Sequence, residues 1–233
     1  MEIRRFLTSS DKIKNDVAEI SGDEFTYAVK VLRQKTGFTV IVNTGDGYDR
    51  IGEISEITKD KLTVKIRETV KNEATPDKKI TLYQGSCKQG KNDFIVQKAV
   101  ELGISRIVFF KSDFVTEKEV NLERLRKIAT EALKQCGRAD SVEVEFTDYF
   151  SAVDNCENAV IFYEGECENT LSDIGNAVSA LFVGSEGGFS EREVGYARDR
   201  GIKTITLGKR ILRAETASVV ATSMIQYLTG GFV

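Results

Sequence analysis

The sequence contains no histidine, no tryptophan and a single proline among its 233 residues. The lack of histidine excludes every mechanism that needs an imidazole base, including Ser-His-Asp and Cys-His catalysis. The cysteines are widely spaced and form no C-x-x-C pair: Cys87, Cys136, Cys156 and Cys167. Since zinc sites are built from clustered cysteine and histidine, we expect no bound metal and a set of reduced thiols.

Long apolar runs are also absent. No run approaches the roughly 18 residues that span a membrane, and the opening residues, MEIRRFL, lack the apolar segment of a signal peptide. We therefore expect a cytoplasmic protein that does not enter a membrane. The formal net charge is −3, so any contact with nucleic acid must come from local basic patches.

Before residue 75 the pattern favours strands. Short stretches rich in β-branched residues predict strands over 38–43, 50–57 and 61–70. A helix over 23–33 would place three apolar side chains on one face: Phe25, Val29 and Leu32. Together these elements indicate a small β-barrel or meander, and the polar stretch after it, which holds Pro76, indicates a linker.

From residue 80 onward, strand and helix patterns alternate, which predicts an α/β fold around a mostly parallel sheet. Helices are expected over 93–102, 122–136, 191–200 and 215–228. The last of these carries a clear apolar stripe at helical spacing: Ala217, Val220, Ala221, Met224, Ile225 and Leu228.

The stretch GSCKQGKN, residues 85–92, follows a predicted strand and fits G-x-x-x-x-G-K, the phosphate-binding loop of nucleotide hydrolases. Asn92, however, stands where that loop carries the Ser or Thr that binds Mg²⁺. A basic loop that contacts a phosphate backbone through Lys88 and Lys91, or a plain solvated turn, also explains the pattern. A P-loop-like nucleotide-binding protein is therefore one alternative.

The stretch LFVGSEGGFSERE connects a predicted strand to a predicted helix. Ser190 and Glu193 form a capping box, so the helix begins there. Glycines before it permit φ > 0 and close approach of the backbone to a ligand: Gly184, Gly187 and Gly188. Open parallel sheets bind ligands at the carboxyl ends of their strands, where this loop lies, although an ordinary turn would have the same composition.

The stretch LGKRILRAETA repeats this arrangement after the next predicted strand and is longer than a tight connection needs. It carries Lys209, Arg210, Arg213 and Glu215. One acidic and one basic loop at neighbouring strand ends together predict a ligand pocket. A solvated charged loop is the alternative, in which Ile211 and Leu212 would be poorly placed.

Six motifs in this order resemble the ribosomal RNA small subunit methyltransferase E family, part of the SPOUT superfamily of S-adenosylmethionine-dependent RNA methyltransferases. They are RRFL, KVLRQKTG, QKAVELGISRI, EALKQCGR, VGSEGGFSERE and LGKRILRAETA, and they cover nearly the whole chain. The last two are the most specific. Ser185 replaces the proline that is usual in the family, and Tyr27 replaces a frequent histidine.

The resemblance implies a PUA-like β-barrel over 1–72 that binds RNA, and a SPOUT α/β domain over 73–233 with a C-terminal trefoil knot. It also implies a homodimer that uses S-adenosyl-L-methionine to methylate N3 of a specific uridine in the 16S rRNA of the small ribosomal subunit. A non-catalytic RNA-binding module with a degenerate pocket is a second alternative.

The resemblance further assigns roles to residues. The expected cofactor-binding residues are Val183, Gly184, Glu186, Gly187, Gly188, Leu207, Gly208, Ile211, Leu212 and Thr216. The expected RNA-binding residues are Arg4, Arg5, Arg33, Lys88 and Lys91.

Methylation of N3 requires that the proton of neutral uracil leave, or that the resulting negative charge be stabilised. Since the chain has no histidine, the candidate bases are the carboxylates of Glu186 and Glu215. Arg138 and Arg213 are the candidates for stabilising charge on the uracil oxygens, with Arg138 reaching the site of the partner in a dimer. The expected catalytic residues are thus Arg138, Arg213 and Glu186.

Overall fold

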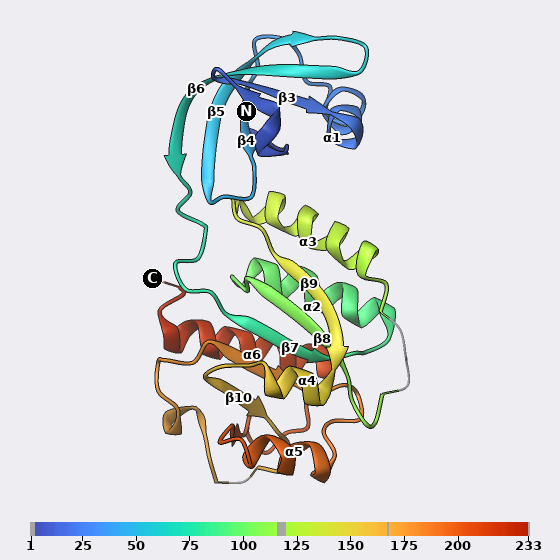
Figure 1. The fold of residues 1–233 in the computed structure, drawn as a ribbon, viewed down its shortest axis with the longest axis vertical. Coiled ribbons are helices and arrows are strands. Elements are labelled where there is room, and N and C mark those ends of the chain that lie inside the picture. The colour runs from blue at the N-terminus through green and yellow to red at the C-terminus, as the bar shows by residue number, and fades with distance from the viewer. Residues whose placement is uncertain (1–2, 116–119, 167, 233) are drawn as a thin grey trace. The chain divides into compact units, whose positions relative to one another are not determined.

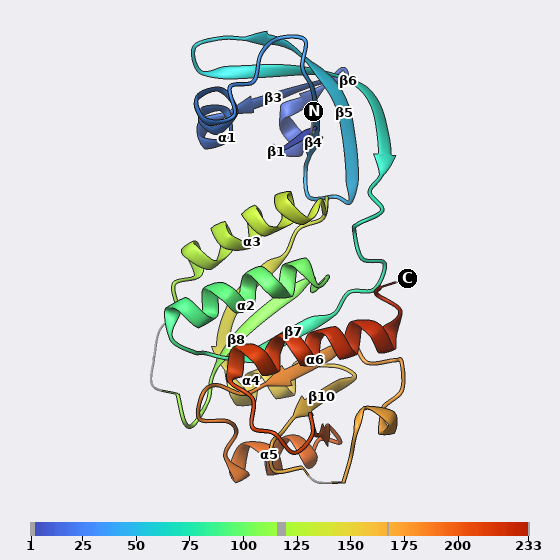
Figure 2. The ribbon, with the colours of Figure 1, turned by 180° about the vertical axis from the view of Figure 1, so that it is seen from behind.

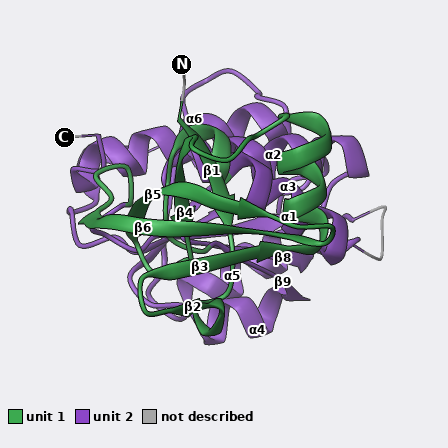
Figure 3. Ribbon diagram, turned by 90° about the horizontal axis from the view of Figure 1, so that it is seen from above, with its two compact units in different colours: residues 1–75, 133–141 green, residues 76–132, 142–233 purple. Residues whose placement is uncertain are grey.

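The computed structural model describes residues 3–115, 120–166 and 168–232. The chain divides into two compact units (Figure 3). Unit 1 contains Met1–Thr75 and Leu133–Ser141, and unit 2 contains Pro76–Ala132 and Val142–Val233. The sequence predicted a connection near Pro76, but it did not predict that residues 133–141 would join the N-terminal part.

Unit 1 is built on a six-stranded sheet in the order β1-β4-β5-β6-β3-β2 (Figure 1). Its strands are β1 (Arg4–Leu7), β2 (Ile13–Lys14), β3 (Val17–Ser21), β4 (Thr39–Asn43), β5 (Tyr48–Ile57) and β6 (Lys61–Lys71), with a 3₁₀ turn at Ser10–Lys12. β1 pairs with β4 in parallel, and the other neighbours are antiparallel. The three strands predicted from 38 to 70 are confirmed as β4, β5 and β6.

The sheet of unit 1 bends over its own core. The pairing of β5 with β6 shifts register in two places, and such bulges increase the local bend and twist of a strand. Gly52 lies at the first shift, where an added Cβ would lie 2.5 Å from the carbonyl oxygen of Lys65. The concave face covers a core that includes Phe6, Ile20 and Leu62.

The predicted helix over 23–33 is formed by two consecutive elements. α1 (Gly22–Thr26) continues into a π-helical turn, Tyr27–Val31. Phe25 is buried, and Val29 and Leu32 pack against the same core, so the predicted apolar face is confirmed. Arg33 then adopts a φ of 52°, a left-handed conformation in which no helix continues.

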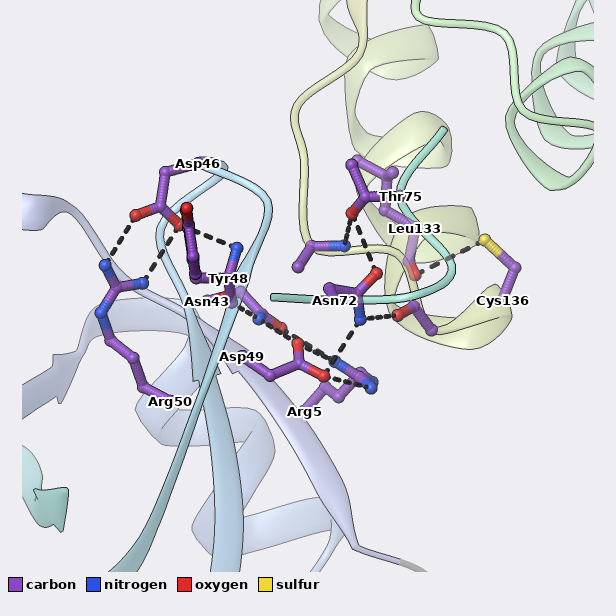
Figure 4. A network of polar contacts seen from close by, with 12 residues as sticks. Arg5, Asn43, Asp46, Tyr48, Asp49, Arg50, Asn72, Thr75, Leu133 and Cys136 are labelled. Atoms are coloured by element: carbon purple, nitrogen blue, oxygen red, sulfur yellow. Dashed lines mark hydrogen bonds and ion pairs between the residues drawn. The ribbon is translucent and has the colours of Figure 1, made fainter. Parts of the chain in front are cut away.

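Asp49 on β5 joins three polar side chains of unit 1 (Figure 4). Its carboxylate accepts hydrogen bonds from Arg5 at 2.5 and 2.9 Å, from Asn43 at 2.8 Å and from Asn72 at 3.0 Å. Burial acts to raise the pKa of Asp49, but these bonds outweigh burial and lower it. Asn72 also donates to the carbonyl of Gly137 at 2.9 Å, which attaches residues 133–141 to the sheet.

Unit 2 is an α/β fold whose six strands all pair in parallel, in the order β12-β10-β11-β7-β8-β9. The strands are β7 (Thr81–Gly85), β8 (Arg106–Lys111), β9 (Glu143–Asp148), β10 (Ala159–Phe162), β11 (Ala180–Val183) and β12 (Lys203–Ile205). The helices are α2 (Gln89–Glu101), α3 (Leu122–Cys136), α4 (Tyr149–Asp154), α5 (Glu191–Arg198) and α6 (Ala214–Thr229), with a 3₁₀ turn at Leu171–Asp173. The predicted parallel sheet is confirmed.

Helices cover both faces of this sheet. α2 and α6 lie side by side on one face (Figure 2), and α4 and α5 contact each other on the opposite face. An aromatic cluster fills the space beneath α4 and α5. In it Tyr83 and Phe182 stack with ring centroids 4.4 Å apart, and Tyr149 meets Phe110 edge to face at 5.3 Å.

Asp49 is the common acceptor of three partly buried donors, so Asp49→Ala should lower the free energy of unfolding by about 2–4 kcal/mol. Asp46→Ala is the matched control, because Asp46 lies at the same hairpin and also pairs with an arginine, but its side chain is 41% exposed. That control should cost less than about 1 kcal/mol. Urea denaturation measures both variants, and equal losses would contradict the role given to Asp49.

Candidate functional site

The carboxyl ends of three adjacent strands in unit 2 surround a cavity. β10 pairs in parallel with β11 on one side and with β12 on the other, so the segments that follow these strands leave the sheet at the same end of the strands. The cavity has a volume of about 370 Å³. Its lining residues are Lys91, Phe162, Tyr163, Glu164, Val183, Gly184, Ser185, Glu186, Gly187, Gly188, Leu207, Gly208, Arg210, Ile211, Leu212, Arg213, Ala214 and Ala217.

The structure brings together nearly all the residues predicted to bind a cofactor. All of them line the cavity except Thr216, which is exposed on the first turn of α6. Sequence reasoning missed the contribution of Phe162, at the end of β10, and of Tyr163 and Glu164, which follow it. Nothing local in the sequence indicates that β10 lies next to β11.

The glycine-rich loop after β11 packs tightly on itself and on its neighbours. Gly188 donates its N–H to the carbonyl of Ser185 at 3.0 Å and has a φ of 70°. An added Cβ on Gly188 would lie 2.1 Å from the carboxylate of Glu164, and one on Gly187 would lie 2.6 Å from the side chain of Phe114. Of the three loop glycines, Gly188 has the predicted positive φ. At Gly187 and Gly188, neighbouring protein atoms occupy the space that a side chain would need.

The far end of this loop is fixed by Glu193, a fully buried carboxylate. Ser190 and Glu193 form the predicted capping box: the Glu193 N–H donates to Ser190 Oγ at 3.1 Å, and Glu193 Oε2 accepts from the Ser190 N–H at 2.8 Å. Glu193 Oε1 also accepts from the backbone N–H of Asp113 at 3.0 Å. The carboxylate therefore joins the start of α5 to the segment after β8.

A lysine that lines the cavity lies between two carboxylates, of which Glu186 also lines the cavity and Glu215 does not. Lys91 Nζ is 3.4 Å from Glu186 Oε1 and 3.2 Å from Glu215 Oε2. Burial acts to raise the pKa of each glutamate, but hydrogen bonds from backbone N–H groups and the charge of Lys91 outweigh it, so both pKa values are lowered. Burial, together with the nearby charge of Glu186, raises the pKa of the Cys87 thiol, which therefore stays protonated.

The stretch GSCKQGKN is not arranged to hold a phosphate. α2 begins at Gln89, and the three backbone N–H groups before it already donate hydrogen bonds. Ser86 donates to the carbonyl of Phe110 at 3.0 Å, Cys87 to the side chain of Asn92 at 2.9 Å, and Lys88 to the carboxylate of Glu186 at 3.3 Å. Because a phosphate would have to displace these bonds, the geometry argues against a nucleotide-hydrolase loop.

The remaining predicted site residues are distributed between the two units. Arg213 caps the start of α6 and lines the cavity. Arg138 belongs to unit 1, is 3% exposed and pairs with Asp140 at 2.6 Å. The predicted RNA-binding residues Arg4, Arg5 and Arg33 are in unit 1, where Arg5 is held by Asp49, and Lys88 and Lys91 are in unit 2. Their predicted contacts with RNA stay predictions.

In residues 3–115, 120–166 and 168–232, no group of three or more Cys, Asp or Glu side chains could hold a metal ion. Among the described residues, no helix has both the length and the apolar character needed to cross a membrane.

Comparison with known proteins gave consistent matches. Residues 74–226 match the RNA methyltransferase domain family, and residues 20–67 match the RNA methyltransferase PUA domain family. The ribosomal RNA small subunit methyltransferase E of Rickettsia conorii is 30% identical, over 98% of this chain and 97% of that protein. The Bacillus subtilis protein of the same name is 30% identical over 90% of both chains.

A solved structure is similar over its whole length. The crystal structure of a ribosomal RNA small subunit methyltransferase E from Neisseria gonorrhoeae bound to S-adenosyl methionine matches with a TM-score of 0.89. It is 27% identical, and the match covers 100% of both chains.

The buried carboxylate of Glu193 accepts hydrogen bonds from two backbone N–H groups, one at each oxygen. A glutamine at this position would place its NH₂ group against one of these N–H donors. Glu193→Gln should lower the free energy of unfolding by about 2 kcal/mol or more. Glu191→Gln, an exposed change on the same helix, should alter it by less than about 0.5 kcal/mol. Thermal and chemical denaturation of both variants measure the difference, and a Glu193→Gln protein as stable as wild type would contradict the assignment.

Proposed function

This chain belongs to the ribosomal RNA small subunit methyltransferase E family, and we propose that it transfers a methyl group from S-adenosyl-L-methionine to N3 of a specific uridine in 16S rRNA. The observation that carries this proposal is the cavity at the ends of β10, β11 and β12. It gathers the residues that the family resemblance assigned to the cofactor, on loops that are far apart in the sequence.

The lining of the cavity fits this cofactor. A volume of about 370 Å³ falls in the range of small-ligand sites, roughly 300–1,000 Å³. Leu207, Ile211 and Leu212 offer apolar surface to an adenine ring, and Ile211 is 92% exposed, so a bound ring would shield it from water. The carboxylates of Glu164 and Glu186 suit the positive charges of the sulfonium and the amino group.

S-adenosyl-L-methionine supplies an activated methyl group, so the protein must orient the uracil and remove the N3 proton. In the transfer the methyl group would pass from sulfur to N3, leaving S-adenosylhomocysteine, and the N3 proton would pass to a carboxylate of this chain. Glu215 suits this role because its Oε2 lies 3.2 Å from Nζ of Lys91, which lines the cavity and is its counter-ion. Arg213, two positions earlier and on the cavity wall, would stabilise negative charge on a uracil oxygen.

The RNA must present an unpaired base. N3 of uracil is engaged in Watson–Crick pairing, so the target uridine has to be single-stranded or flipped out of a helix. Exposed cations on both units would contact the phosphate backbone, with Arg4 and Arg33 on unit 1 and Lys88 on unit 2. Such contacts position the RNA without reading its sequence.

The finer features of the family complete the proposal. Unit 1 would be a PUA-like RNA-binding barrel, and the segments after β11 and β12 would form a trefoil knot in a cytoplasmic homodimer. The chain leaves β12, at the edge of the sheet, and α6 then packs on β11, two strands further in. In such a dimer Arg138 would act toward the site of the partner.

The reaction can be tested on small ribosomal subunits from cells that lack the modification. Incubation with the protein and methyl-labelled S-adenosyl-L-methionine should place one label in the 16S rRNA, and mass spectrometry of the digested RNA should identify it as 3-methyluridine. Label on another atom would contradict the N3 assignment. A protein that binds RNA but neither binds the cofactor nor transfers label would instead be a non-catalytic RNA-binding module.

Arg213→Ala should lower methyl transfer by about 10²–10³-fold because one donor to the developing charge is lost. Affinity for the RNA should change little, since one contact among many is removed. Lys209→Ala is the control, because Lys209 belongs to the same segment but does not line the cavity. Single-turnover rates and filter binding give the two quantities; equal rates in the two variants would argue against a role for Arg213 in the transfer.

A further inference from the structure

We infer that Lys91 is a positioning residue that holds Glu186 and Glu215 together in their ionised forms at the cavity. This inference rests on the proposed methyl transfer and gives Lys91 a task other than contact with RNA. It concerns three side chains that come from separate parts of unit 2.

The geometry places Lys91 where three segments meet. It lies in the first turn of α2, Glu186 in the loop after β11, and Glu215 in the first turn of α6. The ammonium is 3.4 Å from Glu186 and 3.2 Å from Glu215, and 29% of the lysine side chain is exposed. In the described part of the chain, Lys91 is the cation that makes ion pairs with both carboxylates.

Each carboxylate has further neighbours that bear on its charge. Glu186 also accepts a hydrogen bond from the Lys88 N–H and lies beside the neutral thiol of Cys87. The charge of Arg213 adds to that of Lys91 in lowering the pKa of Glu215. Glu164 and Arg210 line the same cavity. The charges around the two glutamates are therefore mixed in sign.

Removal of the ammonium would leave two carboxylates facing each other in a partly enclosed site. Like charges at short range favour protonation of one of them, so a carboxyl pKa would rise. A protonated Glu215 cannot accept the N3 proton, and transfer would then require a higher pH. A role of Lys91 in RNA contact would instead weaken RNA binding equally at every pH.

The sign of the pH effect follows from the lowered carboxyl pKa values. In the wild-type protein both glutamates are ionised from mildly acidic pH upward, so the acidic limb of the kcat/KM profile should lie at low pH. In Lys91→Met the acidic limb of the kcat/KM profile should move up by about 1 pH unit or more. Lys91→Arg retains the charge and should bring the limb back toward its wild-type position.

Cofactor binding supplies a readout that is independent of activity. Calorimetry of the free protein with S-adenosyl-L-methionine should show a nearly constant affinity from about pH 5 to 7 in the wild type, because both glutamate pKa values are lowered. In Lys91→Met the affinity should rise several-fold over that range as the second carboxylate ionises toward the sulfonium. The affinity for S-adenosylhomocysteine, which lacks the sulfonium charge, should change much less over the same pH range.

Lys98→Met is the matched control, because Lys98 is on α2 and pairs with Glu101 at 2.8 Å but does not line the cavity. Its pH profile should be that of the wild type. If Lys91→Met does not fold, Lys91→Gln tests the same point, since it also lacks the ammonium and should show the same rise of affinity with pH. An active wild type whose Lys91 variants keep its pH profile and binding would overturn the inference; an inactive wild type that binds no cofactor would overturn the proposed function.

Discussion

The buried carboxylate of Glu193 fixes the sheet edge on which the cavity depends. A charge removed from water is tolerated only when hydrogen bonds compensate for the lost solvation, and here backbone N–H groups from two segments do so. The glycine-rich loop is thereby held at both ends, by β11 before it and by the start of α5 after it. The position of this loop is thus determined in part by Glu193, which does not line the cavity.

Local patterns predicted the longer elements of the fold well. α3 was predicted with its observed bounds and α6 to within a residue at each end, because long amphipathic stretches carry a periodic signal. β1, β2 and β3 were missed, since strands of two to five residues depend on partners elsewhere in the chain. β1, for instance, pairs in parallel with β4, from which β2, β3 and α1 separate it in the sequence. The addition of residues 133–141 to unit 1 has the same non-local origin.

Sequence patterns within a single loop indicated many of the residues that line the cavity, whereas contacts between distant segments could not be predicted from the sequence. Thr216 is exposed on α6 and does not line the cavity, whereas Ala214 and Ala217, three positions apart on one face, do line it. The motif GSCKQGKN suggested a phosphate site because it fits G-x-x-x-x-G-K. The acceptors of its backbone N–H groups, on Phe110, Asn92 and Glu186, are visible only in the folded chain.

The assignment of residues 133–141 to unit 1 means that neither unit is a contiguous piece of polypeptide. Asn72 and Gly47 donate to the carbonyls of Gly137 and Ala139, and a fragment that ends at Thr75 would lack both of these acceptors. In evolutionary terms, unit 1 could not be exchanged between proteins as one contiguous segment, because residues 1–75 would then be separated from residues 133–141.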